Sequence, residues 1–156
     1  MIFEKRKKPI DSYEKMQYNT IKRTNNIIIK DCIHMKRKIT SKLYEWKNML
    51  NGRMPLLIYG ARQVGKTFEM REFGALYYKN SVYVNFETDE RIGKYFETDI
   101  HADHVISVLE KYYQVKIVPE NTLIIFDEIQ MCERALTSLK YFSEEAPEYH
   151  VMAAGS

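Results

Sequence analysis

The chain has few of the residues that mark secreted or membrane-spanning proteins. Its 156 residues include two cysteines, four prolines and six glycines. Cys32 and Cys132 are isolated, without the spacing of a zinc or redox site, and so favour a reducing compartment over a disulfide framework. No apolar run approaches the roughly 18–20 residues that cross a bilayer, and no apolar signal-peptide segment follows the basic N-terminus. We therefore expect a cytoplasmic protein without membrane association.

Histidine is also scarce, and its positions do not suggest a metal site. The four histidines are His34, His101, His104 and His150. Only His101 and His104 are close in sequence, and no cysteine or histidine is spaced to complete a ligand set with them. We interpret these two as surface or helix-start residues.

The length and composition fit one domain that follows a basic segment. Hydrophobic residues make up 45% of the chain and charged residues 29%, as in ordinary globular proteins. Residues 1–38 hold eleven Lys or Arg against four Asp or Glu, a net charge of +7, whereas residues 39–156 carry −4. Because residues 1–34 show no sustained hydrophobic period, we expect residues 1–38 to be a poorly ordered extension. Another hypothesis is that the functional protein begins near Met35.

A helix is predicted at the start of the regular part, residues 39–156. Thr40 or Ser41 can cap it, and Asn51 with Gly52 can end it. Its expected apolar face consists of Leu43, Trp46, Met49 and Leu50.

Eight residues match the pattern G-x-x-x-x-G-K-T of a phosphate-binding P-loop, from Gly60 to Thr67. The apolar segment 55–59 before them predicts a short buried strand, and residues 68–73 after them have helical spacing. Glycines let the backbone bend around an anion, so that N–H groups and the helix N-terminus point at the phosphates. The pattern therefore favours a nucleotide site over a chance glycine turn.

Two side chains of this loop have specific expected roles. Lys66 would reach the β- and γ-phosphates, and the Thr67 hydroxyl would ligate Mg²⁺. The expected ligand is ATP with Mg²⁺. The expected nucleotide-binding residues are Gly60, Ala61, Arg62, Gln63, Val64, Gly65, Lys66, Thr67 and Phe68.

An apolar run that ends in two carboxylates supplies the candidate hydrolytic residues. Residues 123–126 are apolar and contain two isoleucines, which is typical of a central parallel strand buried on both faces. Asp127 would lie at the carboxyl edge of the sheet and hold Mg²⁺, directly or through water. Glu128 could polarise the water that attacks the γ-phosphate. An acidic helix start is the alternative, and the P-loop about sixty residues upstream argues against it.

Strand and helix signals alternate along the rest of the chain. Segments 81–86 and 149–154 are predicted strands, and segments 90–97, 104–113 and 134–146 are predicted helices. The last helix has Leu136, Leu139, Lys140 and Phe142 spaced to pack on one side. Glu87, after the strand 81–86, could contact the metal or its waters or be a surface residue. The alternation predicts an α/β fold of three layers, with a parallel sheet covered on both faces.

Five segments, in this order, resemble a family of prokaryotic AAA-type ATPases. They are G-A-R-Q-V-G-K-T, V-N-F-E, L-I-I-F-D-E-I-Q, L-T-S-L-K-Y-F and A-A-G-S, and the resemblance covers about residues 35–156. It implies a P-loop NTPase core of the ASCE type with strand order 5-1-4-3-2. It also implies that Asp127 holds Mg²⁺, that Glu128 activates water, and that Ser156 is a polar sensor residue near the nucleotide.

Full-length members of that family carry a C-terminal domain of unknown function after the ATPase core. No residue follows Ser156, so we expect an N-terminal fragment or a shortened gene product, without the fifth strand and the helical lid. The strand 55–59 would then be an exposed apolar edge, prone to self-association or aggregation. No spacing marks Arg62, Arg71 or Arg134 as an arginine finger. Since fingers contribute ~10³–10⁵-fold in other P-loop proteins, we expect weak nucleotide binding and little turnover by the chain alone.

Two other functions remain open from the sequence. A phosphotransferase of the nucleotide-kinase type shares the P-loop, but a kinase must exclude the activated water that Glu128 would prepare. A non-catalytic module could instead bind nucleic acid through the basic segment 1–38.

Overall fold

The computed structural model describes residues 38–156. The basic extension, its hypothetical nucleic-acid contacts and the alternative start at Met35 lie outside the described residues, apart from Lys38. The elements in chain order are α2 (Lys38–Lys47), β1 (Leu56–Tyr59), α3 (Lys66–Tyr77), β2 (Asn80–Asn85), α4 (Glu90–Thr98), α5 (Ala102–Tyr113), β3 (Thr122–Asp127), the short 3-10 helix η1 (Ile129–Met131), α6 (Glu133–Glu145) and β4 (His150–Gly155).

The four strands form one parallel sheet in the order β1-β4-β3-β2. The expected α/β fold with a parallel sheet is confirmed. The observed order matches the corresponding part of the order that the family resemblance implied. Each parallel pair needs a crossover connection, and the helices between the strands supply these connections. All four strands therefore end at the same edge of the sheet, where the P-loop also lies.

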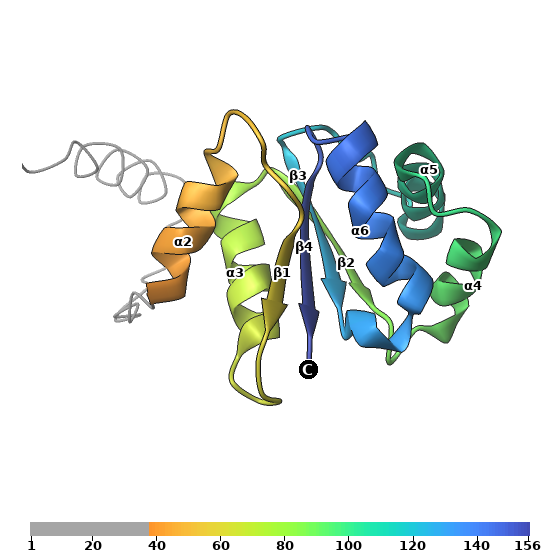
Figure 1. Cartoon of the computed structure of the whole chain (residues 1–156), viewed down its shortest axis with the longest axis horizontal. Helices are drawn as coiled ribbons and strands as arrows, with labels where there is room; N and C mark the ends of the chain where they lie inside the picture. The colour runs from red at the N-terminus through yellow and green to blue at the C-terminus, as the bar shows by residue number, and fades with distance from the viewer. Residues whose placement is uncertain (1–37) are drawn as a thin grey trace, which may run out of the picture. The chain divides into compact units, whose positions relative to one another are not determined.

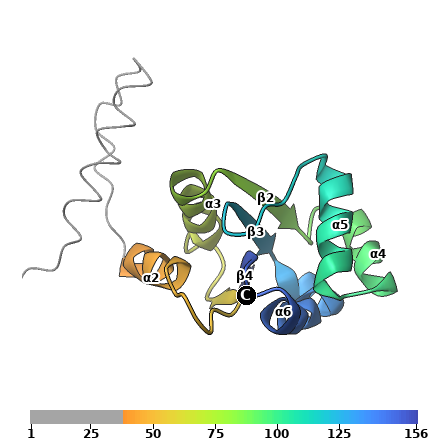
Figure 2. The ribbon, with the colours of Figure 1, turned by 90° about the horizontal axis from the view of Figure 1, so that it is seen from above.

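Helices cover both faces of the sheet, which gives the expected three layers (Figures 1 and 2). On one face, α2 and α3 enclose a core that includes Leu43, Met70 and Phe73. On the other face, α4, α5 and α6 enclose a larger core. Every residue of β3 and β4 is buried, because these two strands are central in the sheet and covered on both sides.

Strand β1 is exposed at the edge of the sheet. Leu56 and Ile58 pack against the α2–α3 core, whereas Leu57 is 37% and Tyr59 58% exposed. The expectation of a fully buried strand is therefore wrong. The expectation of an exposed apolar edge is confirmed for the described residues.

Helix α2 is shorter than the sequence predicts. It ends at Lys47, so Met49 and Leu50 lie beyond it and are exposed, Leu50 to 95%. The guanidinium of Arg53 donates hydrogen bonds of 3.0 Å to the carbonyls of Lys47 and Met49, and these bonds stabilise the helix end. Thr40 lies inside α2 and does not cap it.

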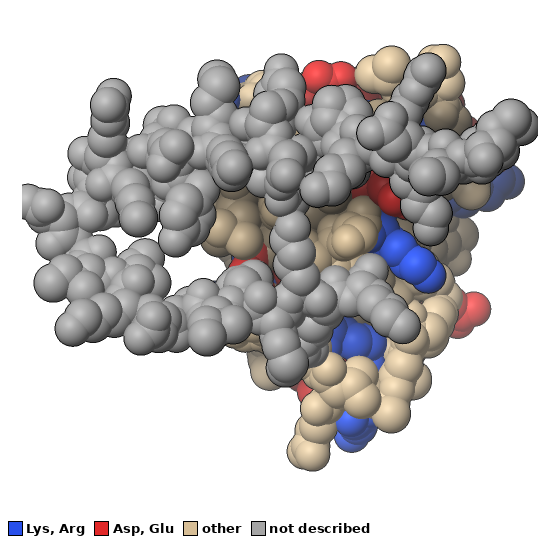
Figure 3. All heavy atoms as spheres, turned by 90° about the vertical axis from the view of Figure 1, so that its left-hand side faces the viewer, with Lys and Arg blue, Asp and Glu red and all other residues tan. Residues whose placement is uncertain are grey.

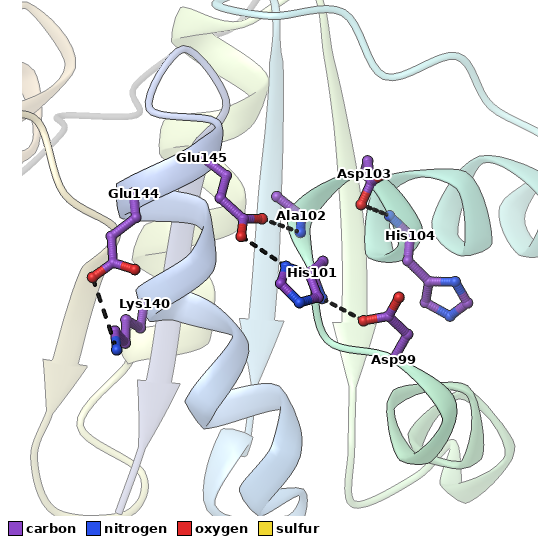
Figure 4. Close-up of polar contacts among 8 residues, drawn as sticks. All are labelled: Asp99, His101, Ala102, Asp103, His104, Lys140, Glu144 and Glu145. Atoms are coloured by element: carbon purple, nitrogen blue, oxygen red, sulfur yellow. Dashed lines mark hydrogen bonds and ion pairs between the residues drawn. The ribbon is translucent and has the colours of Figure 1, made fainter.

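Helix α6 packs largely through the predicted residues, since Phe142 is buried and Leu136 and Leu139 pack against the same core, but Lys140 does not belong to this face. Its buried residues are Ala135, Ser138 and Phe142, whereas Lys140 is exposed. Lys140 makes a surface ion pair of 3.9 Å with Glu144 (Figure 4). The spacing of Ala135, Ser138 and Phe142 is that of one helical face, and Leu136 and Leu139 flank it.

The start of α5 is fixed to the end of α6 by polar contacts (Figure 4). His101, the residue before α5, lies 2.7 Å from Glu145 through its Nδ1 atom, and the amide of Ala102 donates to the same carboxylate over 3.3 Å. The hydrogen bond with Glu145 raises the pKa of His101. His101 is thus at a helix start, as the sequence indicated.

The surface of the described residues carries both signs of charge. The view from the α2 side shows basic and acidic side chains on the visible part of this surface (Figure 3). In the described part of the chain, no helix is long and apolar enough to span a membrane.

A buried histidine makes the fold sensitive to acid. His150 is 2% exposed, lies 2.6 Å from the Tyr78 hydroxyl through Nδ1 and contacts the ring of Trp46. Burial, reinforced by the charges of Arg53 and Lys47, lowers the pKa of His150 from 6.5 to about 4. The unfolded chain therefore binds the proton more readily, and stability falls as the pH drops from 6.5 toward 4. We expect a loss of about 2–3 kcal/mol from this residue, measured by urea unfolding across that range.

His150→Gln isolates this contribution because glutamine does not titrate and can still bond to the Tyr78 hydroxyl. The variant should be less stable than the natural protein at neutral pH and should show a flatter stability profile below it. Equal slopes for the two proteins would contradict the assignment.

Candidate nucleotide-binding site

The loop between β1 and α3 turns sharply at two positions with left-handed backbone. Gly65 has φ 90° and Gln63 has φ 62°. Gly65 adopts this conformation without the clash that a Cβ atom would bring, whereas Gln63 adopts it at some cost. Gly65 is the residue directly before α3, and its carbonyl accepts a helical bond of 3.1 Å from the Glu69 amide. The turn therefore places the loop directly over the helix N-terminus, where partial positive charge favours an anion.

Lys66, the first residue of α3, extends back along this loop. Its ammonium donates hydrogen bonds of 2.6 Å to the Gly60 carbonyl and 2.8 Å to the Ala61 carbonyl. These carbonyls hold a positive charge at the open side of the loop. A phosphate oxygen could replace them as acceptor, and the bond would be stronger because both partners are then charged.

Thr67 and Asp127, sixty residues apart in sequence, are in direct contact. The Thr67 hydroxyl donates to Asp127 Oδ2 over 2.7 Å, which links the start of α3 to the end of β3. Asp127 is only 3% exposed, and its other oxygen accepts a bond of 3.1 Å from the Glu128 amide. The carboxylate is thus fixed in one orientation beside the P-loop.

Tyr83 on β2 is a further partner of this carboxylate. Its hydroxyl donates to Asp127 Oδ2 over 2.7 Å and accepts a longer bond of 3.3 Å from the Asn85 amide group. Burial, followed by the bond to Asp127, raises the pKa of Tyr83. Strand pairing sets Asn85 opposite Asp127, so Tyr83 lies two residues back on the same face of β2. Sequence reasoning did not assign Tyr83 to the site.

The oxygen atoms at this contact fit a magnesium ion. Hydroxyl and carboxylate oxygens are the hard ligands that Mg²⁺ prefers, and the Thr67 and Asp127 oxygens lie 2.7 Å apart. Magnesium at nucleotide sites takes only one or two protein ligands, and phosphates and water provide the others. The described residues contain no group of three or more His, Cys, Asp or Glu that could hold a metal without a nucleotide.

Glu128 follows Asp127 in a left-handed conformation, with φ 49° and ψ 43°. Its Oε2 atom accepts a hydrogen bond of 2.6 Å from the side-chain amide of Gln130, and the same amide lies 3.3 Å from the Ser156 hydroxyl. Glu128 and Ser156, both singled out from the sequence, are therefore brought together through Gln130. The role of Gln130 was missed, because it depends on the turn of η1.

Other candidate residues lie at the rim of the site or away from it. Arg62 and Val64 are exposed on the loop, and Phe68 is 60% exposed on the first turn of α3. Arg71 stacks 4.9 Å from the centre of the Tyr83 ring. Arg134 donates to the Phe96 carbonyl over 2.7 Å.

Glu87 lies at an open hollow next to the sheet edge. This hollow of about 580 Å³ lies between α4 and the segment 131–134, and Phe86 and Glu90 also line it. The Glu87 amide donates 2.9 Å to the side chain of Asn85. The exposed carboxylate of Glu87 is therefore a surface group of this hollow.

Comparison with known families gives one match to this arrangement. The model of a family described as an AAA domain matches residues 52–156, which include the loop, both carboxylates and all four strands. No curated protein and no solved structure matched the chain. The family match covers most of the chain, so the protein belongs to the AAA domain family and contains a nucleotide-binding core of the AAA-type ATPases.

Proposed function

We propose that this chain binds ATP with Mg²⁺ and hydrolyses it to ADP and phosphate. The observation that carries the proposal is the 2.7 Å contact between the Thr67 hydroxyl and Asp127, with Glu128 next in sequence. A phosphate-binding loop, a magnesium-binding pair and a second carboxylate at one edge of the sheet are the parts that ATP hydrolysis requires.

The main chain of residues 60–67 would bind the triphosphate. Its amides and the N-terminus of α3 offer hydrogen-bond donors and partial positive charge to the phosphates. Lys66 would exchange the carbonyls of Gly60 and Ala61 for β- and γ-phosphate oxygens. A phosphate oxygen carries negative charge, so its attraction to the ammonium is stronger than that of a neutral carbonyl.

Thr67 and Asp127 would hold the magnesium ion. When bound, Mg²⁺ would supply positive charge against the negative charge that develops on the phosphate oxygens. Tyr83 and the Glu128 amide keep the Asp127 carboxylate in place, because each donates a hydrogen bond to it. The orientation of the Asp127 carboxylate is therefore already set, and the Thr67 hydroxyl proton would turn away from it when both oxygens bind the ion.

Glu128 would act as the general base. One of its oxygens is held by Gln130, so the other can accept a proton from the attacking water. The hydroxyl of Ser156, at the end of the central strand β4, would donate to a phosphate oxygen. The isolated cysteines support a cytoplasmic setting for this activity.

Phosphate release is the test of this proposal. With the protein in excess over radiolabelled ATP, we expect Mg²⁺-dependent release of inorganic phosphate, and EDTA should stop it. Excess protein makes a slow first turnover measurable. Transfer of label to an added nucleoside monophosphate, without phosphate release, would instead identify a phosphotransferase.

A further inference from the structure

Gln130 connects two strand ends that carry candidate site residues. It lies in η1, directly after β3, and its amide nitrogen is 2.6 Å from Glu128 Oε2 and 3.3 Å from Ser156 Oγ. Glu128 follows β3, and Ser156 follows β4. One side-chain amide thus contacts both the candidate base and the candidate phosphate sensor.

The orientation of the Gln130 amide is determined by its neighbours. The Glu128 carboxylate only accepts hydrogen bonds, so the amide nitrogen of Gln130 must face it. The Gln130 oxygen then points toward Gly155, and a Cβ atom at that position would lie 2.9 Å from it. Glycine at position 155 therefore leaves the room that this side chain occupies.

The conformation has a cost, which argues for a functional constraint. The Gln130 oxygen is buried and has no hydrogen-bond partner among the described residues. Glu128 itself has a left-handed backbone, which is unfavourable for a residue with a side chain. Two unfavourable features within three residues, beside a candidate active site, are typical of pre-organised catalytic groups.

We propose that Gln130 is a positioning residue that couples Ser156 to Glu128. Gln130 holds one oxygen of the Glu128 carboxylate, which leaves the other oxygen free to take a proton from water. The longer bond to Ser156 is the weaker of the two and is lost first when the Ser156 hydroxyl turns to a phosphate oxygen. The Gln130 amide is then committed to Glu128, so the base is fixed when a γ-phosphate is present. This inference rests on the proposed ATP hydrolysis.

The test is a comparison of Gln130→Met with the natural chain in single-turnover ATP hydrolysis. Methionine keeps the length of the side chain but removes the amide donor. We expect the rate constant to fall about tenfold, because a misplaced catalytic group costs up to ~10²-fold. The dissociation constant for ATP and the melting temperature should stay close to those of the natural chain. The rate constant of the Gln130→Glu variant should fall further, because this substitution sets two carboxylates against each other.

A second arm separates positioning from a merely structural role. In a Glu128→Gln background, Gln130→Met should cause no further loss of rate, because its effect passes through the missing base. If the Gln130→Met protein does not fold, the Gln130→Asn protein takes its place in both measurements, since the shorter asparagine side chain cannot contact both Glu128 and Ser156. The inference would be overturned if the folded Gln130 variant hydrolysed ATP at the natural rate. It would also be overturned if the Gln130 substitution lowered the rate equally in the Glu128→Gln background, or if it weakened ATP binding in parallel with the rate. Natural protein that binds ATP without cleaving it would overturn the proposed function and this inference together.

Discussion

Glu128→Gln is expected to slow phosphate release strongly while the protein still binds ATP. Glutamine has the same shape, and its carbonyl oxygen can still accept the bond from Gln130, but it cannot take a proton from water. Positioned general bases contribute typically ~10²–10⁴-fold, so the single-turnover rate should fall by about that factor. Quenched-reaction measurements with the protein in excess give this rate, and filter binding gives the ATP affinity.

A second carboxylate variant provides the control for Glu128→Gln. Glu133→Gln removes the same charge from an exposed position on the first turn of α6 and should leave the rate unchanged. If Glu128→Gln hydrolyses ATP as fast as the natural chain, Glu128 is not the base.

Lys66→Ala is expected to weaken ATP binding by about 10–100-fold. The substitution removes an ammonium group at the mouth of the loop, and bonds to charged groups contribute about 1.5–3 kcal/mol. The fold should persist, because the two bonds lost in the free protein are to loop carbonyls. Competition against a fluorescent ATP analogue measures the change in affinity.

Lys42→Ala is the matched control for this substitution. It removes one positive charge from the exposed side of α2, away from the P-loop, and should leave ATP affinity unchanged. A Lys66→Ala protein that binds ATP as tightly as the Lys42→Ala protein would exclude the proposed role of the ammonium.

Local sequence patterns were sufficient to predict the α/β fold class and to single out the central residues of the candidate site. The glycine pattern before Lys66 and Thr67 depends on backbone geometry within eight residues. The buried strand β3 has an unbroken apolar run, and its end fixes the position of Asp127 at the sheet edge. Each of these features is determined by neighbours in sequence, so no tertiary information was needed.

Contacts between distant elements could not be predicted in the same way. Tyr83 reaches Asp127 only because β2 and β3 pair in one particular register. Gln130 reaches Ser156 because η1 turns back toward β4 and residue 155 has no side chain. The exposure of β1 depends on strand order, which the family resemblance implied and the apolar composition of Leu56–Tyr59 alone does not show.

The most direct test of the central claim follows the main-chain amides of the loop during an ATP titration. In ¹⁵N-labelled protein with Mg²⁺, the amide signals of residues 60–67 should show larger shifts than those of α4 and α5. That result would establish that the loop backbone binds the phosphates. If the amide signals of the loop do not shift at millimolar ATP, or if only signals from other parts of the chain shift, phosphate binding by the loop backbone is contradicted.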